Sequence, residues 1–398
     1  MNQDAASNDV IPFAHLADTH YARFLILDEA TDAHGALLPP ALVFMSDFDG
    51  SAARYLRRLV GSMGSGLDQI FSHCRNYPPL PAVMPEGRLA YLRAHRTRAD
   101  AVYVNTIGRT VEQIRQEAQL RDAIESFLDA HANGWAGRDP QGVRAEIQQF
   151  VRNEASLDWA LDPPRPLGLL HRLSAGVHLI ALPLIVLLLL PVLMIVLPVC
   201  VVLIRIRETS DAAPHIKPDP AHVVELAAAE DRTPQNQFSA VGLFKPGLLR
   251  GLTARVVLLL VNYGIHHLFD RANLAGVKTI HFARWVPLND RRRMIFASNY
   301  DGSLESYMDD FIDKLAWGLN AVFSNGIGYP KTRWLLFGGA KNEQAFKDYL
   351  RVHQIRTDVW YAAYPGLTAV NIENDARIRA GLSGEMTPTE ASIWLSRF

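Results

Sequence analysis

An uninterrupted apolar run in the middle of the chain constrains this protein more than any other feature. The run extends from Leu179 to Ile204 and contains no charged residue. It is longer than the roughly 20 apolar residues that a membrane-spanning helix needs. A helix in a soluble core rarely stays apolar on every face for about seven turns. The sequence therefore predicts a membrane segment at residues 177–205.

The sequence leaves two shapes open for this segment. As a single helix it would be about 40 Å long, more than the ~30 Å hydrocarbon core of a bilayer. Pro183, Pro191 and Pro198 lie within it, and each favours a kink. The segment is therefore either a kinked transmembrane helix or a re-entrant hairpin that turns near Pro191. A hairpin turn in lipid leaves backbone groups unpaired, which counts against the second shape.

Composition narrows the class of protein. A chain of 398 residues suggests two or three domains, and 49% apolar residues exclude a largely disordered chain. The formal net charge of -1 predicts no nucleic-acid partner. Two cysteines, Cys74 and Cys200, exclude a disulfide scaffold and a Cys-rich metal site, so we expect no metal. The N-terminus lacks the basic and apolar regions of a cleaved export signal.

The sequence before the apolar run is similar to the sequence after it. Three blocks return in the same order: His20-Tyr-Ala-Arg23-Phe24 as His281-Phe-Ala-Arg284-Trp285, Asp49-Gly-Ser as Asp301-Gly-Ser, and the Tyr-Leu-Arg-x-His block that ends at His95 as the one that ends at His353. The spacing between the blocks changes only by lengths typical of loops. The pattern predicts a duplicated module with copies near 15–130 and 274–385.

Each copy predicts the same order of elements. Two alternating strands are followed by an Asp-Gly-Ser turn, whose Ser is a plausible N-cap for a long amphipathic helix. A second helix, a third strand and a final helix complete the copy. The fold class predicted from this order is α+β, with helices over one sheet face.

The element order and the opening HYARFLIL resemble the ferredoxin-like modules of the dimeric α+β barrel superfamily, which includes dye-decolourising peroxidases and EthD-type proteins. The resemblance covers each copy alone. It implies tandem ferredoxin-like-type modules that flank a central membrane segment and pair across a two-fold axis, within one chain or in a homodimer. The peroxidases' catalytic acid motif and haem-ligand block are missing, and the opening hairpin departs from the βαββαβ order. The resemblance therefore does not extend to their chemistry.

The predicted organisation has five parts. These are a first copy at 1–133, an amphipathic connector at 134–176, the membrane segment at 177–205, a polar linker with an amphipathic or interfacial helix at 206–270, and a second copy at 271–398. Two copies that pack together in one chain must lie on the same side of a bilayer. We expect this to be the cytoplasmic face.

The first group of candidate functional residues comes from the repeated blocks. The catalytic candidates are His281, Arg284 and Asp301, with His20, Arg23 and Asp49 as their equivalents. A His beside an aromatic residue on a strand can act as acid or base. The alternatives are a strand-end His bonded to a turn, and an Asp that satisfies backbone donors at a helix start.

The second group consists of candidates for ligand binding: His95, Arg98, His353, Arg356, Trp285 and Tyr361. The histidines and arginines lie at the ends of predicted helices, where they can bind an anionic headgroup. As cations at a helix C-terminus they are equally well explained by the helix dipole.

These features predict a membrane-anchored protein whose duplicated module binds an apolar or lipid-like small molecule at the surface of the lipid bilayer. One alternative is a membrane-bound, peroxidase-like oxidoreductase for lipophilic substrates, with haem as the cofactor to test. The other is a non-enzymatic scaffold for a protein partner. The sequence does not choose between an enzyme and a binding protein.

Overall fold

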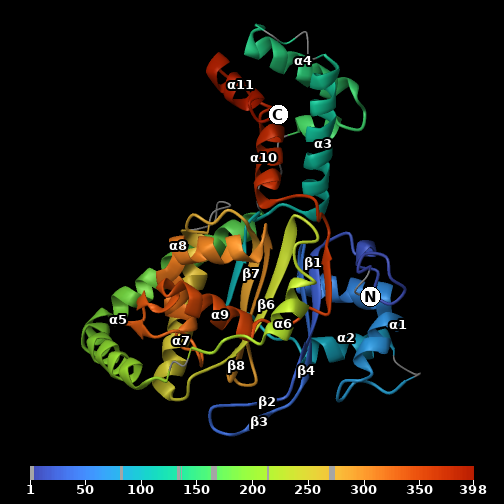
Figure 1. The fold of residues 1–398 in the computed structure, drawn as a ribbon. Coiled ribbons are helices and arrows are strands. Elements are labelled where there is room, and N and C mark those ends of the chain that lie inside the picture. Colours follow the sequence, from blue (N-terminus) through green and yellow to red (C-terminus); the bar gives the residue numbers. More distant parts are fainter. Residues whose placement is uncertain are drawn as a thin grey trace.

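Two antiparallel sheets packed face to face form the body of the protein, and helices cover their outer sides (Figure 1). The fold class is α+β, as predicted. The computed structural model describes residues 4–80, 84–131, 135, 137–162, 168–212, 215–268 and 274–398. The predicted boundaries at 133/134 and 270/271 lie outside the described residues.

The same six elements occur in the same order on both sides of the apolar run. The first unit contains β1 (Thr19–Leu27), β4 (Ala41–Phe48), α1 (Ala52–Phe71), α2 (Pro85–Ala94), β5 (Ala101–Val104) and α3 (Val111–Ala130). The second unit contains β7 (Ile280–Leu288), β8 (Arg293–Asp301), α8 (Leu304–Phe323), α9 (Glu343–His353), β11 (Val359–Ala362) and α10 (Ala369–Ala380). Two small hairpins, β2 (Ala30–Thr31) with β3 (Leu37–Leu38) and β9 (Thr332–Arg333) with β10 (Phe337–Gly338), lie in the loops.

The Asp-Gly-Ser turns begin the long helices as predicted. Ser51 and Ser303 are the N-caps of α1 and α8, and each side chain accepts a hydrogen bond from the backbone N–H three residues later. The preceding glycines, Gly50 and Gly302, have φ near +80°, a conformation that other residues adopt at a cost. The turn sequence therefore sets where both helices start.

The third strand of each unit lies in the sheet of the other unit. β5 pairs with β7, and β11 pairs with β1, so the strand orders are β11-β1-β4 and β5-β7-β8-β6. The registers correspond: Val359 lies opposite Phe24, and Ala101 lies opposite Trp285. Neither sheet is complete without a strand from the other unit.

The prediction of a polar linker is wrong for part of residues 206–270. This stretch contains a short helix, α6 (Pro220–Ala227), and a nine-residue strand, β6 (Gln235–Leu243), which pairs with β8 along its whole length. Phe238 and Ala240 alternate into the core, and the buried Gln235 amide donates to the backbone oxygen of Tyr364. In the sequence, the polar residues of β6 resemble those of a linker, because the groups that they bond to lie far away in the chain.

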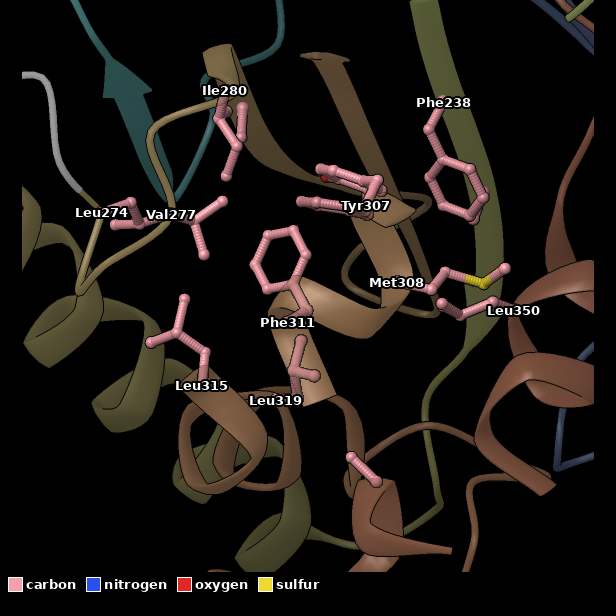
Figure 2. Packing of buried hydrophobic residues seen from close by; sticks show 14 of the residues in the cluster. Phe238, Leu274, Val277, Ile280, Tyr307, Met308, Phe311, Leu315, Leu319 and Leu350 are labelled. Carbon is pink, nitrogen blue, oxygen red and sulfur yellow. The ribbon is translucent and has the colours of Figure 1, made fainter. Parts of the chain in front are cut away.

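Apolar side chains fill three layers around the two sheets. Between the sheets pack Leu25, Leu27, Met45, Val286, Ile295 and Ala297. A second layer lies between the first sheet and α1, and a third lies between the second sheet and the helices α8 and α9. Figure 2 shows the third layer, with Phe311 and Leu319 of α8 gathered near Phe238 and Ile280 of the sheet.

Two arginines connect the sheets across their interface. Arg23 donates to the backbone oxygens of Phe238 and Ser298, at 2.9 and 3.0 Å, and also to the Asn299 side chain. Arg284 donates in the opposite direction, to the Ser46 oxygen at 3.3 Å and to the Asp47 carboxylate. Burial lowers the pKa of Arg23 to about 9 and that of Arg284 to about 10, so both stay protonated at neutral pH.

A helical head stands at one end of the body. There α3 and α10 rise side by side, and α4 (Pro140–Asn153) and α11 (Pro388–Leu395) lie at their far ends (Figure 1). The predicted amphipathic stretch near 143–151 is part of α4. Its buried face joins Leu120 of α3, Ile378 of α10 and Trp394 of α11 in a separate apolar cluster.

The central apolar run belongs to one continuous helix, α5 (Leu169–Ser210), and no turn interrupts it at Pro191. The structure therefore contradicts the predicted alternative of a re-entrant hairpin that turns near Pro191. A second apolar helix, α7 (Leu248–His267), lies beside it. Within the described residues, these are the two helices that are long and apolar enough to cross a membrane. α5 bows outward from the body (Figure 1).

We predict that Arg284→Met lowers the free energy of unfolding by about 3–5 kcal/mol, because it leaves the buried Asp47 carboxylate without its partner. The double variant Arg284→Met with Asp47→Leu loses less, because no unpaired charge remains. Thermal and urea unfolding measured in detergent check both values. The control is Arg138→Met in an exposed ion pair with Glu146, which changes stability by less than about 1 kcal/mol. Equal effects of Arg284→Met and Arg138→Met would contradict the prediction.

Candidate functional site

The repeated histidines and aspartates form two matching pairs. The Nε2 atom of His20 lies 3.0 Å from Oδ1 of Asp49, and that of His281 lies 2.7 Å from Oδ1 of Asp301. The second oxygen of each Asp accepts a backbone N–H, from Val111 in the first unit and from Ala369 in the second. Each aspartate therefore satisfies a backbone donor at a helix start, as the second interpretation expected. The helices are α3 and α10, however, and not α1 and α8, which follow the aspartates directly in the chain.

Aromatic rings surround both pairs at the interface of the two units. His20 contacts Phe282 at 5.4 Å between ring centroids, and His281 contacts Tyr21 at 5.7 Å. The Tyr364 hydroxyl lies 2.7 Å from Nδ1 of His20, so both nitrogens of this ring are engaged. His20 and His281 are 4% and 2% exposed. This geometry positions two helices at the strand ends, and both imidazole rings are buried.

The arginines of the first candidate group do not join these pairs. Arg23 and Arg284 point to the opposite face of their strands and hold the two sheets together, as described above. The predicted separation of His and Arg onto different strand faces agrees with this placement. The six catalytic candidates thus form two capping pairs and two cross-sheet connections.

The ligand-binding candidates are scattered. His95 and His353 end α2 and α9, and in each ring Nδ1 contacts the backbone oxygen four residues earlier, at 2.9 and 2.8 Å. Arg98 is exposed, and Arg356 is exposed and paired with Glu225. The last two candidates are buried in the outer cores: Trp285 packs on Phe296, and Tyr361 packs on Phe13. Two of the candidates line small cavities in the second unit, His353 in one and Trp285 in another.

Sequence reasoning missed a buried set of four charges between α3 and α10. Arg121 of α3 pairs with Asp375 of α10 at 3.3 Å, and Arg379 of α10 pairs with Glu117 of α3 at 3.2 Å. Both acids are 1% exposed. Burial raises the pKa of Asp375 to about 7, and Arg121 opposes this shift. The sequence did contain this pattern. In the alignment of the two copies that matches Arg121 with Arg379, Glu117 matches Asp375, so each copy has an acid four residues before the arginine.

The outer surfaces of α5 and α7 form the largest unexplained feature. Leu188 and Ile195 of α5 are 78% and 73% exposed, and the most apolar stretch of this helix is not buried at all. α7 buries one face against β5 and α8, while its other face exposes a stripe of leucines and a valine: Leu248, Leu252, Val256, Leu259 and Leu260. Trp334 and Phe337 of the β9–β10 hairpin are also exposed nearby. A contiguous apolar surface of this kind marks an interaction site.

The C-terminal end of α5 is fixed to the body by a buried carboxylate. Glu208 accepts hydrogen bonds of 2.8 Å from the Thr332 hydroxyl and from the backbone N–H groups of Trp334 and Leu335. Immediately after the helix, Asp211 forms ion pairs with Lys245 and with Arg250 at the start of α7. These contacts tie this end of the helix to the second unit.

The other end of the apolar run is fixed to the end of α7. His178 contacts His267 at 2.7 Å, and the Tyr263 hydroxyl donates to the Leu179 oxygen at 2.9 Å. Leu179 lies four residues before Pro183, which has no N–H to offer it. From His178 to Asp211, α5 contains about 50 Å of helix, while the facing part of α7 spans about 25 Å. α5 must therefore bow between its two attachments.

Comparison with protein-family models, with curated proteins and with solved structures finds no match for this chain.

We predict that the free energy of unfolding depends on pH through Asp375. Its folded pKa of about 7 lies above the ordinary value of 3.8, so the folded state holds the proton more tightly. The stability that this proton contributes is present below pH 4 and is lost as the pH rises to about 7, by at most about 4 kcal/mol. Urea unfolding between pH 4 and 8 checks this. Asp375→Asn gains stability relative to the wild type over that window, whereas Asp129→Asn, at an exposed carboxylate of α3, follows the wild type. Parallel curves for Asp375→Asn and the wild type would overturn the prediction.

Proposed function

We propose that this protein is anchored in a membrane by the bowed helix α5, and that it presents a paired α+β body on one face of the bilayer. The exposed apolar surface of α5 carries this proposal, because no residue in the most apolar stretch of this helix is buried within the described chain. Water is a poor environment for such a surface, while the hydrocarbon of a bilayer is a good one. The exposed Trp334 ring beside Arg205 suits the membrane interface, where Trp and Arg are often found.

The attachments of α5 support an anchor that enters and leaves the same side. Both ends of its apolar part are held by α7, the β9–β10 hairpin and the loop before α7, all of which belong to one folded body. A bowed but unbroken helix also avoids the cost of a hairpin turn in lipid, because most of its backbone groups stay paired within the helix. Three prolines spaced by eight and seven residues distribute the bend.

The exchange of third strands supports the same placement. β5 completes the sheet of the second unit and β11 completes that of the first, so a bilayer between the units would have to separate hydrogen-bonded strands. We further propose that the two units arose by duplication of one module. Their matching registers, serine caps, His–Asp pairs and cross-sheet arginines all support this origin.

We expect the double variant Leu188→Glu with Ile195→Glu to lose membrane binding. Each charge placed in the hydrocarbon costs a few kcal/mol, so the bound fraction should fall more than tenfold. Flotation of the full-length protein with phosphatidylcholine vesicles measures this fraction. The control is Ile26→Glu with Ile393→Glu, at exposed apolar positions outside α5 and α7, which should float like the wild type. Flotation of the α5 variant at the wild-type level would reject the anchor.

Labelling tests the placement of the units. In a Cys74→Ser, Cys200→Ser background, single cysteines replace Arg98 in the first unit and Arg356 in the second, both exposed side chains. A membrane-impermeant maleimide added to sealed vesicles should label both positions or neither, because the two units share one face. Labelling of one position and protection of the other, reversed when the vesicles are inverted, would show that the bilayer separates the units.

A further inference from the structure

The tip of the β9–β10 hairpin exposes three large apolar side chains. Trp334, Leu336 and Phe337 are 44%, 42% and 57% exposed, although they lie within four consecutive residues of the chain. Contact of such side chains with water is unfavourable, so a group of them at one tip indicates a surface that something else covers.

The backbone of this tip is strained. Trp334 and Leu335 have φ angles of +57° and +60°, in the left-handed region that Gly and Asn adopt most easily. Tight hairpin loops usually place Gly, Asn or Asp at such positions. The chain instead keeps a Trp whose ring is only partly buried, so packing within the protein does not explain the choice. Residues held in a strained conformation cluster at functional sites.

Two buried polar side chains hold the tip in this shape. Glu208 of α5 is 1% exposed, and its carboxylate accepts the backbone N–H groups of Trp334 and Leu335, each at 2.8 Å. Asn320 of α8 is fully buried, and its amide donates to the backbone oxygen of Leu336 at 2.8 Å. The hairpin backbone is therefore fixed to two helices, while the apolar side chains of its tip stay exposed.

The tip lies where α5 leaves its apolar run. This run ends at Ile204, and the guanidinium of the next residue, Arg205, lies 5.9 Å from the centroid of the Trp334 ring. Glu208 follows Ile204 by only four residues, or about 6 Å of helix. Arg333, directly before the tip, is exposed. If α5 lies in a bilayer, this depth is that of the headgroups, where Trp is enriched and arginines extend their charge toward water.

We propose that the β9–β10 hairpin is a second membrane contact, in which Trp334, Leu336 and Phe337 enter the headgroup boundary of one leaflet beside the end of α5. This inference rests on the proposed anchor and adds a contact with the same phospholipid bilayer. The tip continues the exposed apolar surface of α5, which is why its partner is a lipid surface. A stable protein interface takes about 800 Å² from each partner, and the tip alone is too small to supply that area.

A fluorescent probe at the tip tests this contact. In the Cys74→Ser, Cys200→Ser background, Phe337→Cys is labelled with the fluorophore NBD, and the full-length protein is reconstituted into phosphatidylcholine nanodiscs, whose two faces both meet the solvent. A lipid with a nitroxide near the headgroup end of its acyl chain should quench most of the fluorescence, and aqueous iodide little of it. The matched control is Ile393→Cys on α11, because Ile393 is also 57% exposed. At that position iodide should quench the probe and the lipid nitroxide should not.

A pair of substitutions tests whether the apolar neighbours place the probe in lipid. Trp334→Ser with Leu336→Ser should transfer the probe at position 337 from lipid quenching to iodide quenching, because the tip then gains little by leaving water. The control is Ile26→Ser with Leu37→Ser, at exposed apolar positions of the first unit, which should leave lipid quenching unchanged. Thermal unfolding shows whether each variant is folded. Lipid quenching that persists in the Trp334→Ser, Leu336→Ser variant contradicts the proposal.

Two further outcomes overturn the proposal. Quenching of the Phe337 probe by iodide places the tip in water, and protection from both quenchers means that a protein surface, such as a second copy of the chain, covers it. Vesicle flotation separates this proposal from the anchor. A protein that floats with an iodide-quenched probe retains the anchor and lacks the hairpin contact. If Leu188→Glu with Ile195→Glu floats like the wild type while lipid quenches the probe, the anchor fails and the hairpin contact stands.

Discussion

The exchange of third strands between the two units is the constraint on which the rest of the structure depends. Because β5 belongs to the sheet of β7 and β11 to the sheet of β1, each unit needs the other to complete its own hydrogen-bond ladder. Arg23 and Arg284 add charged donors across the face between the sheets. Loss of these partners would leave buried guanidinium groups unpaired, which costs free energy. The arginines therefore favour the one arrangement of the two sheets in which both are bonded. The pairing of the units is therefore a property of the fold itself.

That pairing decides what the apolar helix can do. A single pass through a bilayer would place the units on opposite faces and break the strand exchange. α5 instead has both ends fixed to one body, by Glu208 at one end and by the contacts of His178 and Leu179 at the other. The helix between these attachments is about twice as long as the facing part of α7, so it bows outward and exposes its apolar surface. The proposed anchor follows from this mismatch in length.

The two units differ in the packing around their Tyr–His stacks. The histidine of each His–Asp pair is buried in both units, which suits a role in positioning α3 and α10. Around the Tyr–His stack on α2 and α9 the units differ: Cys74 closes the space in the first unit, while Gly326 and Gly242 open it in the second. β6, which has no counterpart among the described residues of the first unit, supplies one wall of this space. The presence of β6 is thus one difference between the second unit, which has a cavity here, and the first, which has a packed core.

Local chemistry was readable from the sequence alone: the unbroken apolar run, the strand and helix periods, the serine caps and the opposite faces of His20 and Arg23. These depend on residues close together in the chain. The exchange of strands, the place of β6 in a sheet and the helix that each Asp caps were not readable, because their hydrogen-bond partners are distant in sequence. The cavity depends in addition on missing side chains, at Gly242 and Gly326, and a gap in packing exists only once the surrounding segments are brought together in space.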